Sequence, residues 1–306
     1  MLRRGATCAP AVPGSAMNYR HAYHAGNFAD VVKHWVFAFS IDYLKRKDAP
    51  FRVIDTHAGR GRYQLTAAEA NKTGEWRAGI GRLIGPDAKP LPGHLAKGLK
   101  VYLDVVRGEN APGALTTYPG SPAIAQALLR AQDTLVANEA HPEELQHLAL
   151  DLGRVRGGTV KLLGLDGWMG LRALLPPPER RGVILIDPPF EEDGELHRLV
   201  TGLKEGLARF ATGVFIAWYP IKDAKTPRRL LKSLVELAPL KLISLEVLIR
   251  QPRNPEALNG CGLIVANPPF TLESELKIAA PALVQRLAAG PGANCSVRWV
   301  KALHTH

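Results

Sequence analysis

One short stretch constrains the fold of this chain more than any other: residues 182–190, which read Gly-Val-Ile-Leu-Ile-Asp-Pro-Pro-Phe. A brief, unbroken run of apolar and β-branched residues is typical of a strand that is buried on both faces, as in a parallel sheet. Pro188 and Pro189 cannot donate a hydrogen bond to a sheet, so the strand must end before them. Asp187 is therefore expected at the carboxyl edge of the sheet, where open α/β folds bind their ligands. A strand that merely ends at a proline turn has the same local sequence, so this motif alone does not decide the function.

Three earlier segments have the same form, each a short strand-like run that ends in an acid. They are residues 51–55, 134–139 and 160–166, which end in Asp55, Glu139 and Asp166. Four acids at one sheet edge indicate a ligand with hydroxyl groups, amines or a positive charge. The turn after Asp55 contains Gly59 and Gly61, which suits the close approach of backbone to a cofactor. It lacks the Gly-Lys-Ser/Thr sequence of a phosphate-binding P-loop.

Three further strand-like segments follow, at residues 214–220, 240–249 and 262–266. The link between the last two is too short, and too rich in proline, for the crossover that a parallel pair requires. We therefore predict a Rossmann-like α/β fold with a seven-stranded, mostly parallel sheet whose last strand is antiparallel. A second motif that also suits amine chemistry, Asn267-Pro-Pro-Phe270, follows this last strand. An antiparallel last strand would put Asn267 at the opposite edge of the sheet from Asp187.

Residues 66–117 separate the first two predicted strands by more than one crossover helix needs, and several glycines interrupt them. We interpret them as a small helical insertion, with one helix over residues 91–106. Residues 1–16 are rich in proline, glycine and alanine and contain no apolar run that would make a signal peptide. A disordered leader is therefore expected at 1–16, and residues 17–306 are expected to form a single domain.

Composition narrows the class of partner. Lys and Arg number 39 against 28 Asp and Glu, and the formal net charge of +11 favours a polyanion such as nucleic acid over an acidic membrane surface. No apolar run approaches the roughly 18 residues that a membrane span needs. The three cysteines are far apart, which excludes a disulfide framework or a zinc ribbon and fits a cytoplasmic protein. His21, His24 and His34 have no partner at metal-ligand spacing, so no metal site is expected.

The segment that precedes the first helix is polar and aromatic. Residues 18–27 show neither helical nor strand periodicity, and Tyr19 and its neighbours have side chains that can stack on a nucleic acid. Asn27 is a suitable N-cap for a helix that begins at Phe28, where apolar residues recur at helical spacing. His34 lies on the flank of this helix and could face a ligand, although a histidine in that place more often has a structural role.

Five longer motifs complete the pattern. They are Tyr19-Arg-His-Ala-Tyr-His-Ala-Gly-Asn-Phe-Ala-Asp-Val-Val-Lys-His34, Asp55-Thr-His-Ala-Gly59, Gly61-Arg-Tyr63, Tyr118-Pro-Gly-Ser-Pro122 and Arg180-Arg-Gly-Val-Ile-Leu-Ile-Asp-Pro-Pro189. From residue 17 to about residue 299, the chain resembles the bacterial RlmJ family of 23S ribosomal RNA adenine-N6 methyltransferases. The resemblance implies the Rossmann-like fold of the class I methyltransferases. The leader lies outside the resemblance, and Phe190 stands where many relatives carry Tyr.

The resemblance implies S-adenosylmethionine as the methyl donor. Glu139 would accept from its ribose hydroxyls, and Asp166 would accept from its adenine amino group. The residues at the positions that bind this cofactor in the family are His34, His57, Ser121, Glu139, Asp166, Gly167 and Asp187. Ser121 alone would be interpreted as a helix cap, because Pro122 after it suits a first helical turn.

The same resemblance implies roles in catalysis and in substrate binding. Asp187 and the carbonyl of Pro188 would accept the two N–H bonds of an adenine amine, and Asp187 would then take the proton as general base. Phe190 would stack on the base, and Tyr19 and Lys33 would contact the nucleic acid. The implied substrate is 23S ribosomal RNA at adenine 2030. The implied enzyme is a monomer that needs no metal, membrane or obligate protein partner.

Two other functions share parts of this pattern. A DNA adenine-N6 or other amino methyltransferase also uses Asp-Pro-Pro-aromatic, so the catalytic motif does not exclude it. A basic nucleic-acid-binding protein without catalytic activity would have the same charge. The second alternative is disfavoured because all four acids at the predicted strand ends are present.

Overall fold

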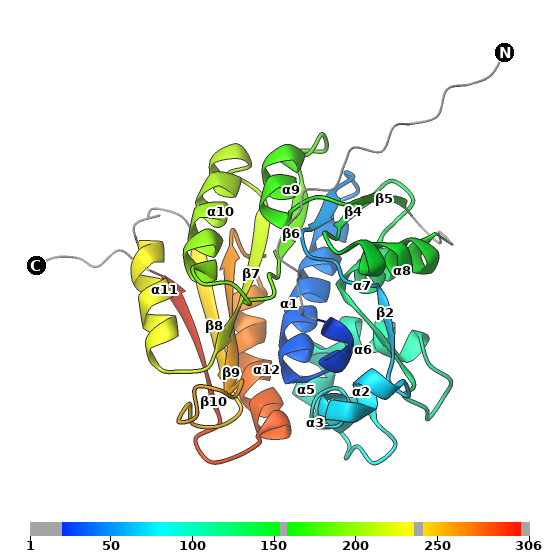
Figure 1. The fold of residues 1–306 in the computed structure, drawn as a ribbon, viewed down its shortest axis with the longest axis vertical. Coiled ribbons are helices and arrows are strands. Elements are labelled where there is room, and N and C mark those ends of the chain that lie inside the picture. Colours follow the sequence, from blue (N-terminus) through cyan, green and yellow to red (C-terminus); the bar gives the residue numbers. More distant parts are fainter. Residues whose placement is uncertain (1–19, 154–157, 236–240, 301–306) are drawn as a thin grey trace, which may run out of the picture.

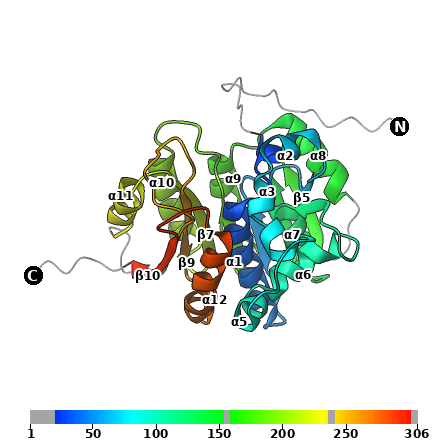
Figure 2. The ribbon, with the colours of Figure 1, turned by 90° about the horizontal axis from the view of Figure 1, so that it is seen from below.

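The computed structural model describes residues 20–153, 158–235 and 241–300 (Figure 1). The predicted leader, residues 1–16, and the predicted nucleic-acid contact Tyr19 lie outside the described residues. The structure has three layers, with a twisted sheet between two layers of helices, as Figure 2 shows from below.

The central sheet contains the strands that the sequence predicted and one more. Its strands are β1 (Arg52–Asp55), β4 (Thr134–Asn138), β5 (Thr159–Leu163), β6 (Gly182–Ile186), β7 (Val214–Ile221), β8 (Leu242–Leu248), β9 (Gly260–Ala266) and β10 (Asn294–Val300). The order across the sheet is β10-β8-β9-β7-β6-β1-β4-β5. Neighbours from β5 to β7 are parallel, whereas β9 is antiparallel to both β7 and β8. The Rossmann-like class and the antiparallel strand at residues 260–266 are therefore confirmed.

The prediction of seven strands omitted β10. This strand pairs with β8 alone among the described residues and forms an edge of the sheet. Its side chains are half-buried or exposed, so its sequence, Asn-Cys-Ser-Val-Arg-Trp-Val, needs no apolar run. The apolar runs that identified the inner strands are a consequence of burial on both faces, which an edge strand such as β10 does not have.

One face of the sheet is covered by α1 (Phe28–Lys45), α7 (Ser121–Leu128), α8 (Pro142–Leu152) and α12 (Leu272–Leu287). The other face is covered by α9 (Gly167–Leu174), α10 (Glu195–Arg209) and α11 (Lys225–Val235). Asn27 caps α1 as predicted, because its Oδ1 accepts from the backbone N–H groups of Ala29 and Asp30 at 2.9 and 3.0 Å. Helix α1 is buried on almost every side, since it lies between the sheet and the helices α6, α7 and α12.

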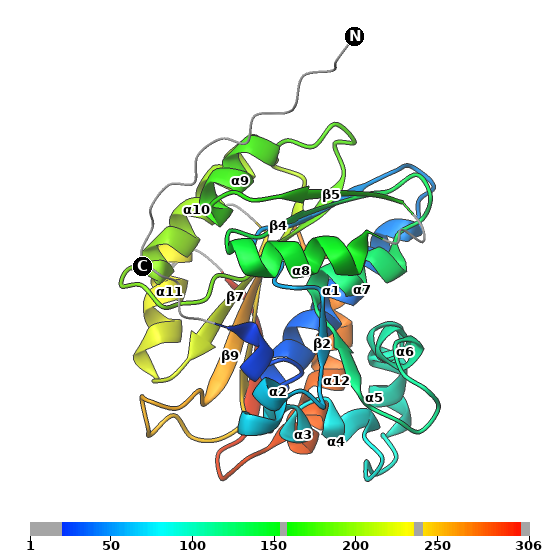
Figure 3. The same cartoon turned by 45° about the vertical axis from the view of Figure 1, so that its right-hand side comes forward.

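The insertion lies between β1 and β4 in sequence and beside η1 (His21–Tyr23) and α12 in space (Figure 3). It is framed by a two-stranded antiparallel ribbon of β2 (Arg62–Gln64) and β3 (Thr117–Pro119). Its helices are α2 (Ala68–Thr73), α3 (Glu75–Ala78), α4 (Gly81–Ile84), α5 (Gly93–Gly98) and α6 (Lys100–Gly108). The single helix predicted over 91–106 is thus two helices. They meet at Leu99, and at the preceding Gly98 a Cβ atom would lie only 3.0 Å from the Cβ of Ala279 on α12.

Candidate active site

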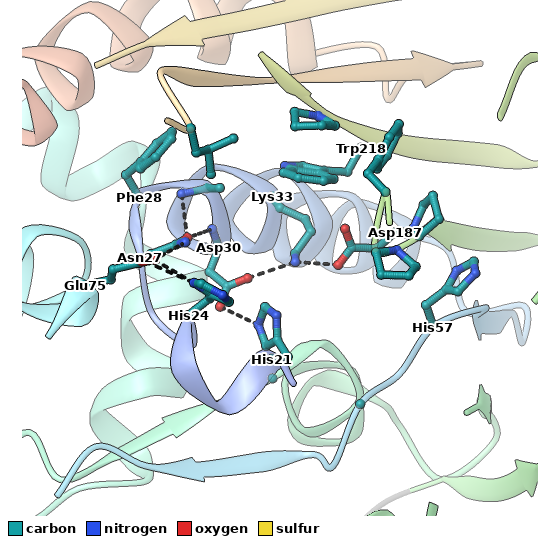
Figure 4. A pocket seen from close by; sticks show the side chains of 18 of the residues that line it. His21, His24, Asn27, Phe28, Asp30, Lys33, His57, Glu75, Asp187 and Trp218 are labelled. Atoms are coloured by element: carbon teal, nitrogen blue, oxygen red, sulfur yellow. Dashed lines mark hydrogen bonds and ion pairs between the residues drawn. The ribbon is translucent and has the colours of Figure 1, made fainter. Parts of the chain in front are cut away.

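A cavity of about 950 Å³ opens at the carboxyl edge of β1, β4 and β6 (Figure 4). Its walls come from η1, the start of α1, the turn after β1, the start of α7 and the segments that follow β4, β6 and β7. The predicted site residues that line it are Lys33, His34, His57, Ser121, Glu139, Asp187, Pro188 and Phe190. The structure therefore brings together residues that are up to 157 positions apart in the sequence.

Asp187 follows β6 directly, and one of its oxygens is held by a buried lysine. Lys33 Nζ lies 2.5 Å from Asp187 Oδ2 and 2.8 Å from Asp30 Oδ1. The side chains of Lys33 and Asp30 are 4% and 2% exposed, whereas that of Asp187 is 16% exposed and faces the cavity (Figure 4). Burial alone would lower the pKa of Lys33, but the two carboxylates outweigh burial and raise it above its ordinary value. Lys33 is therefore a permanent ammonium that orients Asp187.

This geometry changes the predicted environment of Lys33. The resemblance implied a contact of Lys33 with nucleic acid, and the structure shows its ammonium between two carboxylates at the base of the cavity. Asp30, which the sequence analysis did not single out as a site residue, completes the cluster. The only sequence signal for it was the spacing of Asp30 and Lys33, which puts them on one side of a helix.

Asp30 also fastens the segment that precedes α1. Its Oδ2 accepts from the backbone N–H of Gly26 at 2.9 Å and lies 2.9 Å from Nε2 of His21. Burial would raise the pKa of Asp30, but the charges of His21 and Lys33 hold it well below its usual range. The carboxylate therefore stays ionised and links η1, α1 and Asp187 in one network.

Two histidines of the cavity wall are neutral. Burial lowers the pKa of His34 to about 3 and the pKa of His57 to about 4. His34 Nδ1 lies 2.7 Å from the hydroxyl of Tyr118, and His57 Nδ1 lies 2.8 Å from the hydroxyl of Thr56. Both rings therefore offer uncharged polar groups near neutral pH. A wall of this kind does not repel a cationic ligand.

Glu139 follows β4 and is fixed by backbone groups on both of its oxygens. Its Oε2 accepts from the N–H of Gly59 at 2.7 Å, and its Oε1 accepts from the N–H of His141 at 2.8 Å. Each oxygen retains a lone pair, so the carboxylate can accept from two adjacent hydroxyls. Gly59 has a φ of +63°, and a Cβ atom there would lie 2.3 Å from the hydroxyl of Tyr63. The turn after β1 therefore requires glycine at this position.

Ser121 lines the cavity, and Asp55 lies behind the lining, next to Ser121 and His57. Asp55 is fully buried, its Oδ2 has no hydrogen-bond partner among the described residues, and burial raises its pKa to about 7. The hydroxyl of Ser121 opposes that rise. Ser121 was expected to cap α7, but it is the first residue of that helix. The N-cap position is occupied by Gly120, and no side chain caps the helix. An unsatisfied carboxylate oxygen beside a cavity indicates a ligand that donates to it.

Phe190 and Trp218 form an aromatic corner of the cavity. Their ring centroids are 5.6 Å apart at an interplanar angle of 73°. Phe190 has a φ of +55°, a strained backbone conformation for an aromatic residue, which turns the chain sharply after the two prolines. Trp218 lies on β7, the neighbour of β6, and was not identified from the sequence. The pairing of β6 with β7 is what makes it part of the site.

Comparison with known proteins identifies the family. The family model described as RsmJ, Ribosomal RNA large subunit methyltransferase D, RlmJ, matches residues 48–301. The Ribosomal RNA large subunit methyltransferase J of Escherichia coli (strain K12) is 39% identical over 284 residues, which are 93% of this chain and 99% of that protein. The protein of the same name from Haemophilus influenzae is 37% identical over 285 residues, with the same two shares. This chain belongs to the RlmJ family.

A solved structure supports the same assignment. The crystal structure of protein LPL1258 from Legionella pneumophila is 34% identical, has a TM-score of 0.80 and covers 90% of this chain and 98% of that one. The family that the motifs indicated is therefore confirmed, and with it the class I methyltransferase fold. As a member of the RlmJ family, the chain is a methyltransferase.

Two predicted cofactor residues of this RlmJ-family chain lie outside the cavity lining. Asp166 is exposed, and its Oδ1 caps α9 by accepting from the N–H groups of Trp168 and Met169. Gly167 lies directly behind His57, since a Cβ atom there would be 2.3 Å from Nε2 of that ring. Gly167 therefore adjoins the cavity through His57.

Among the residues that the structure describes, no group of three His, Cys, Asp or Glu side chains is arranged to hold a metal ion. None of the described helices is long and apolar enough to cross a membrane.

Proposed function

We propose that this chain transfers a methyl group from S-adenosylmethionine to the exocyclic N6 of an adenine in 23S ribosomal RNA, at adenine 2030 by its resemblance to the family. The observation that carries the proposal is the arrangement of Asp187, which lies at the carboxyl end of β6, on the cavity wall, with one oxygen held by Lys33 and an aromatic corner beside it. Membership of the RlmJ family supports ribosomal RNA as the substrate class.

The residues of the cavity fit the proposed donor. Glu139 suits two adjacent ribose hydroxyls, and the neutral imidazoles of His34 and His57 tolerate a sulfonium. When bound, the donor supplies a methyl group on a positively charged sulfur. We propose that it is held by His34, His57, Ser121, Glu139, Asp166, Gly167 and Asp187.

The chain's own residues prepare the amine. The lone pair of an adenine amine is delocalised into the ring, so the group is a poor nucleophile until its nitrogen becomes tetrahedral. Lys33 already occupies Asp187 Oδ2, which leaves Oδ1 to accept one N–H bond of the amine, while the Pro188 carbonyl accepts the other. The lone pair then points away from both acceptors and toward the methyl group. Asp187 takes the proton as the new N–C bond forms. Fixed orientation supplies much of the rate.

The aromatic corner suits a flat base. An adenine inside a helix is not accessible, so the target must be single-stranded or turned out of its stack before it enters the cavity. Phe190 and Trp218 meet edge to face, so a base that stacks on the Phe190 ring would lie beside the Asp187 carboxylate. We propose that this stacking aligns the amine with Asp187 and Pro188.

The test is to identify the methylated product. The wild type and the Asp187→Ala variant are each incubated with labelled S-adenosylmethionine and either unmodified ribosomal RNA or plasmid DNA, and the nucleosides are then separated. We expect N6-methyladenosine from RNA with the wild type and none with the variant. Asn267→Ala, which alters the second Pro-Pro-Phe motif at the other edge of the sheet, is the matched control and should label RNA normally.

Each other outcome has a defined meaning. Labelling of DNA alone would support a DNA adenine methyltransferase. Equal labelling by Asp187→Ala would remove Asp187 from the mechanism. RNA binding without any labelling by the wild type would support a protein that binds nucleic acid without catalysis.

A further inference from the structure

A row of cations runs along α11 and the turn before it. Lys222, Lys225, Arg228, Arg229 and Lys232 are all exposed, and together they form what we call the α11 basic stripe. Within residues 20–153, 158–235 and 241–300, none of the five has a carboxylate within ion-pair distance. The one acid among residues 222–235, Asp223, uses its Oδ1 to cap the start of the helix.

The sequence of α11 directs these cations to solvent. Pro227, Leu230 and Leu234 are buried, and the two leucines pack into the apolar layer between the sheet and α10. Lys225, Arg228, Arg229 and Lys232 recur at intervals of three or four residues, which puts them on the side away from that layer. From Lys225 to Lys232 the helix rises by roughly 10 Å, a length that corresponds to about three phosphates of one strand.

The stripe differs from many other cations of the described surface because five cations without an ion pair follow one another along one segment. Arg62, Arg172 and Arg298 are each bound to a glutamate, at distances of 2.5 to 2.7 Å. A segment with five cations and one acid, by contrast, presents a strong local positive field to solvent.

The stripe begins at the active site. Lys222, which follows β7 directly, lines the cavity, and Arg250 lines it from the loop between β8 and β9. The first turn of α11 lies at the same end of the molecule as this loop and η1, as Figures 1 and 3 show from two directions. A strand with one base in the cavity would therefore have neighbouring phosphates within reach of the stripe.

We propose that the α11 basic stripe binds the phosphate backbone of the RNA beside the target adenine. The inference rests on the proposed function, because it takes nucleic acid as the substrate. A membrane surface fits less well, since the large apolar residues of α11 are turned inward and the exposed ones of the described chain lie on other elements. Phosphate contacts supply affinity and orientation and contribute little to chemistry.

The test compares two variants that lose the same charge. The stripe variant carries Lys225→Gln, Arg228→Gln, Arg229→Gln and Lys232→Gln and spares Lys222, which lines the cavity. The control variant carries Arg46→Gln, Lys47→Gln, Arg209→Gln and Lys241→Gln. These four cations are exposed and lie at the opposite edge of the sheet: Arg46 and Lys47 follow α1, Arg209 is the last residue of α10, and Lys241 precedes β8.

The readouts are methylation kinetics with unmodified ribosomal RNA and, without the methyl donor, the binding of a fluorescent 23S RNA fragment at several salt concentrations. For the stripe variant we expect KM for RNA to rise at least about tenfold while kcat changes less than about twofold. The slope of log affinity against log salt should fall by about 2 to 3, because each lost phosphate contact removes roughly 0.7. The control variant should match the wild type in KM for RNA, in kcat and in the salt slope.

Binding of both variants to anionic lipid vesicles is measured in parallel. Three results would overturn the proposal: equal behaviour of the two variants, an unchanged salt slope in the stripe variant, or loss of vesicle binding by the stripe variant with its RNA binding intact. The binding assay needs no methyl transfer. If the wild type methylates no nucleic acid, the proposed function fails, whereas the stripe is still judged by its contribution to RNA affinity.

Discussion

Two segments of this protein have almost the same sequence and entirely different surroundings. Asp187-Pro-Pro-Phe190 follows β6, and Asn267-Pro-Pro-Phe270 follows β9. The first lines the cavity, where Asp187 is bound to Lys33 and Phe190 meets Trp218. The second lies at the other edge of the sheet, where Nδ2 of Asn267 donates to two backbone carbonyls at 2.8 Å and Phe270 is 91% exposed.

Strand direction, rather than local sequence, therefore decides which of the two motifs lies at the cavity. β6 is parallel to β1 and β7, whereas β9 is antiparallel to β7, so the two motifs leave the sheet at opposite edges. The edges also differ in how their polar groups are satisfied. Asp133, at the amino edge, accepts from Arg130 and from the backbone of Phe51. Asp55, at the carboxyl edge, retains an oxygen without a partner among the described residues.

The most direct test of the difference between the two motifs is to exchange their polar residues. Asp187→Asn should lower kcat by about 10²- to 10⁴-fold, because an amide cannot take the proton. Asn267→Asp should leave kcat within about twofold and lower the free energy of unfolding by about 1 to 3 kcal/mol, because a carboxylate cannot donate to the carbonyls of Ala211 and Gly213. Methyl incorporation and urea unfolding measure the two effects. A catalytic defect in folded Asn267→Asp would show that the edges do not divide these roles.

A second comparison removes one cation from each edge. Lys33→Met should lower the free energy of unfolding by about 3 to 5 kcal/mol and abolish activity, because it leaves Asp30 and Asp187 buried side by side without a counter-charge. Arg52→Met, which breaks the pair with Glu179 at the amino end of β1, should cost less stability and leave kcat intact. Denaturant titration and initial rates test both. Equal losses of stability would mean that Lys33 is no more embedded than Arg52.

A third comparison uses pH. The pKa of Asp55 is about 7 in the folded state, above its ordinary value, so the folded protein holds a proton there that the unfolded chain has released. The stability that this proton confers is complete below about pH 4 and is lost as pH rises through 7. Between pH 5 and pH 7 the wild type should therefore lose about 2 kcal/mol from this group.

The matched variants at the two edges should have opposite effects. Asp55→Asn should remove this pH slope and raise the free energy of unfolding at pH 8. Asp133→Asn should lower the free energy of unfolding at pH 8, because it removes the ion pair of Asp133 with Arg130. Unfolding curves at several pH values, without the methyl donor, distinguish the two. A pH slope that persists in Asp55→Asn would assign it to another group.

The smallest expected effect concerns the proposed donor. Glu139→Gln should weaken S-adenosylmethionine binding by about tenfold, because one amide oxygen is a poorer acceptor for two hydroxyls than a carboxylate. Glu179→Gln, at the amino edge, should bind the donor as the wild type does. Calorimetry measures both affinities. An unchanged affinity in Glu139→Gln would count against the ribose contact.

Much of this architecture was predictable because its signals are local. The apolar run of 182–186 and the prolines after it identify a buried strand with a defined end, and the spacing of 28–39 identifies α1. The short link before β9 excludes a parallel crossover, which was enough to separate Asp187 from Asn267. The signals failed where burial was partial, as in β10, and where a helix was interrupted at a single residue, as at Leu99 between α5 and α6.

The contacts of the site were less predictable because they depend on pairing between distant segments. The sequence put Lys33 at a nucleic-acid interface, and only the packing of α1 against the end of β6 encloses it between Asp30 and Asp187. Trp218 joins the site because β7 pairs with β6. No short segment of the sequence indicates the contact of Lys33 with Asp187 or the position of Trp218 beside Phe190.

The sequence by itself determined where most of the strands lie, that an acid stands at or within three residues of the end of four of them, and that prolines stop the chain after two of them. Only the tertiary structure decided which of these ends meet, which oxygens are already occupied and which remain for a ligand. The physical reason is that a strand is specified by its own apolar pattern. Its direction, its neighbours and the burial of its end depend on contacts between parts of the chain that are far apart in sequence.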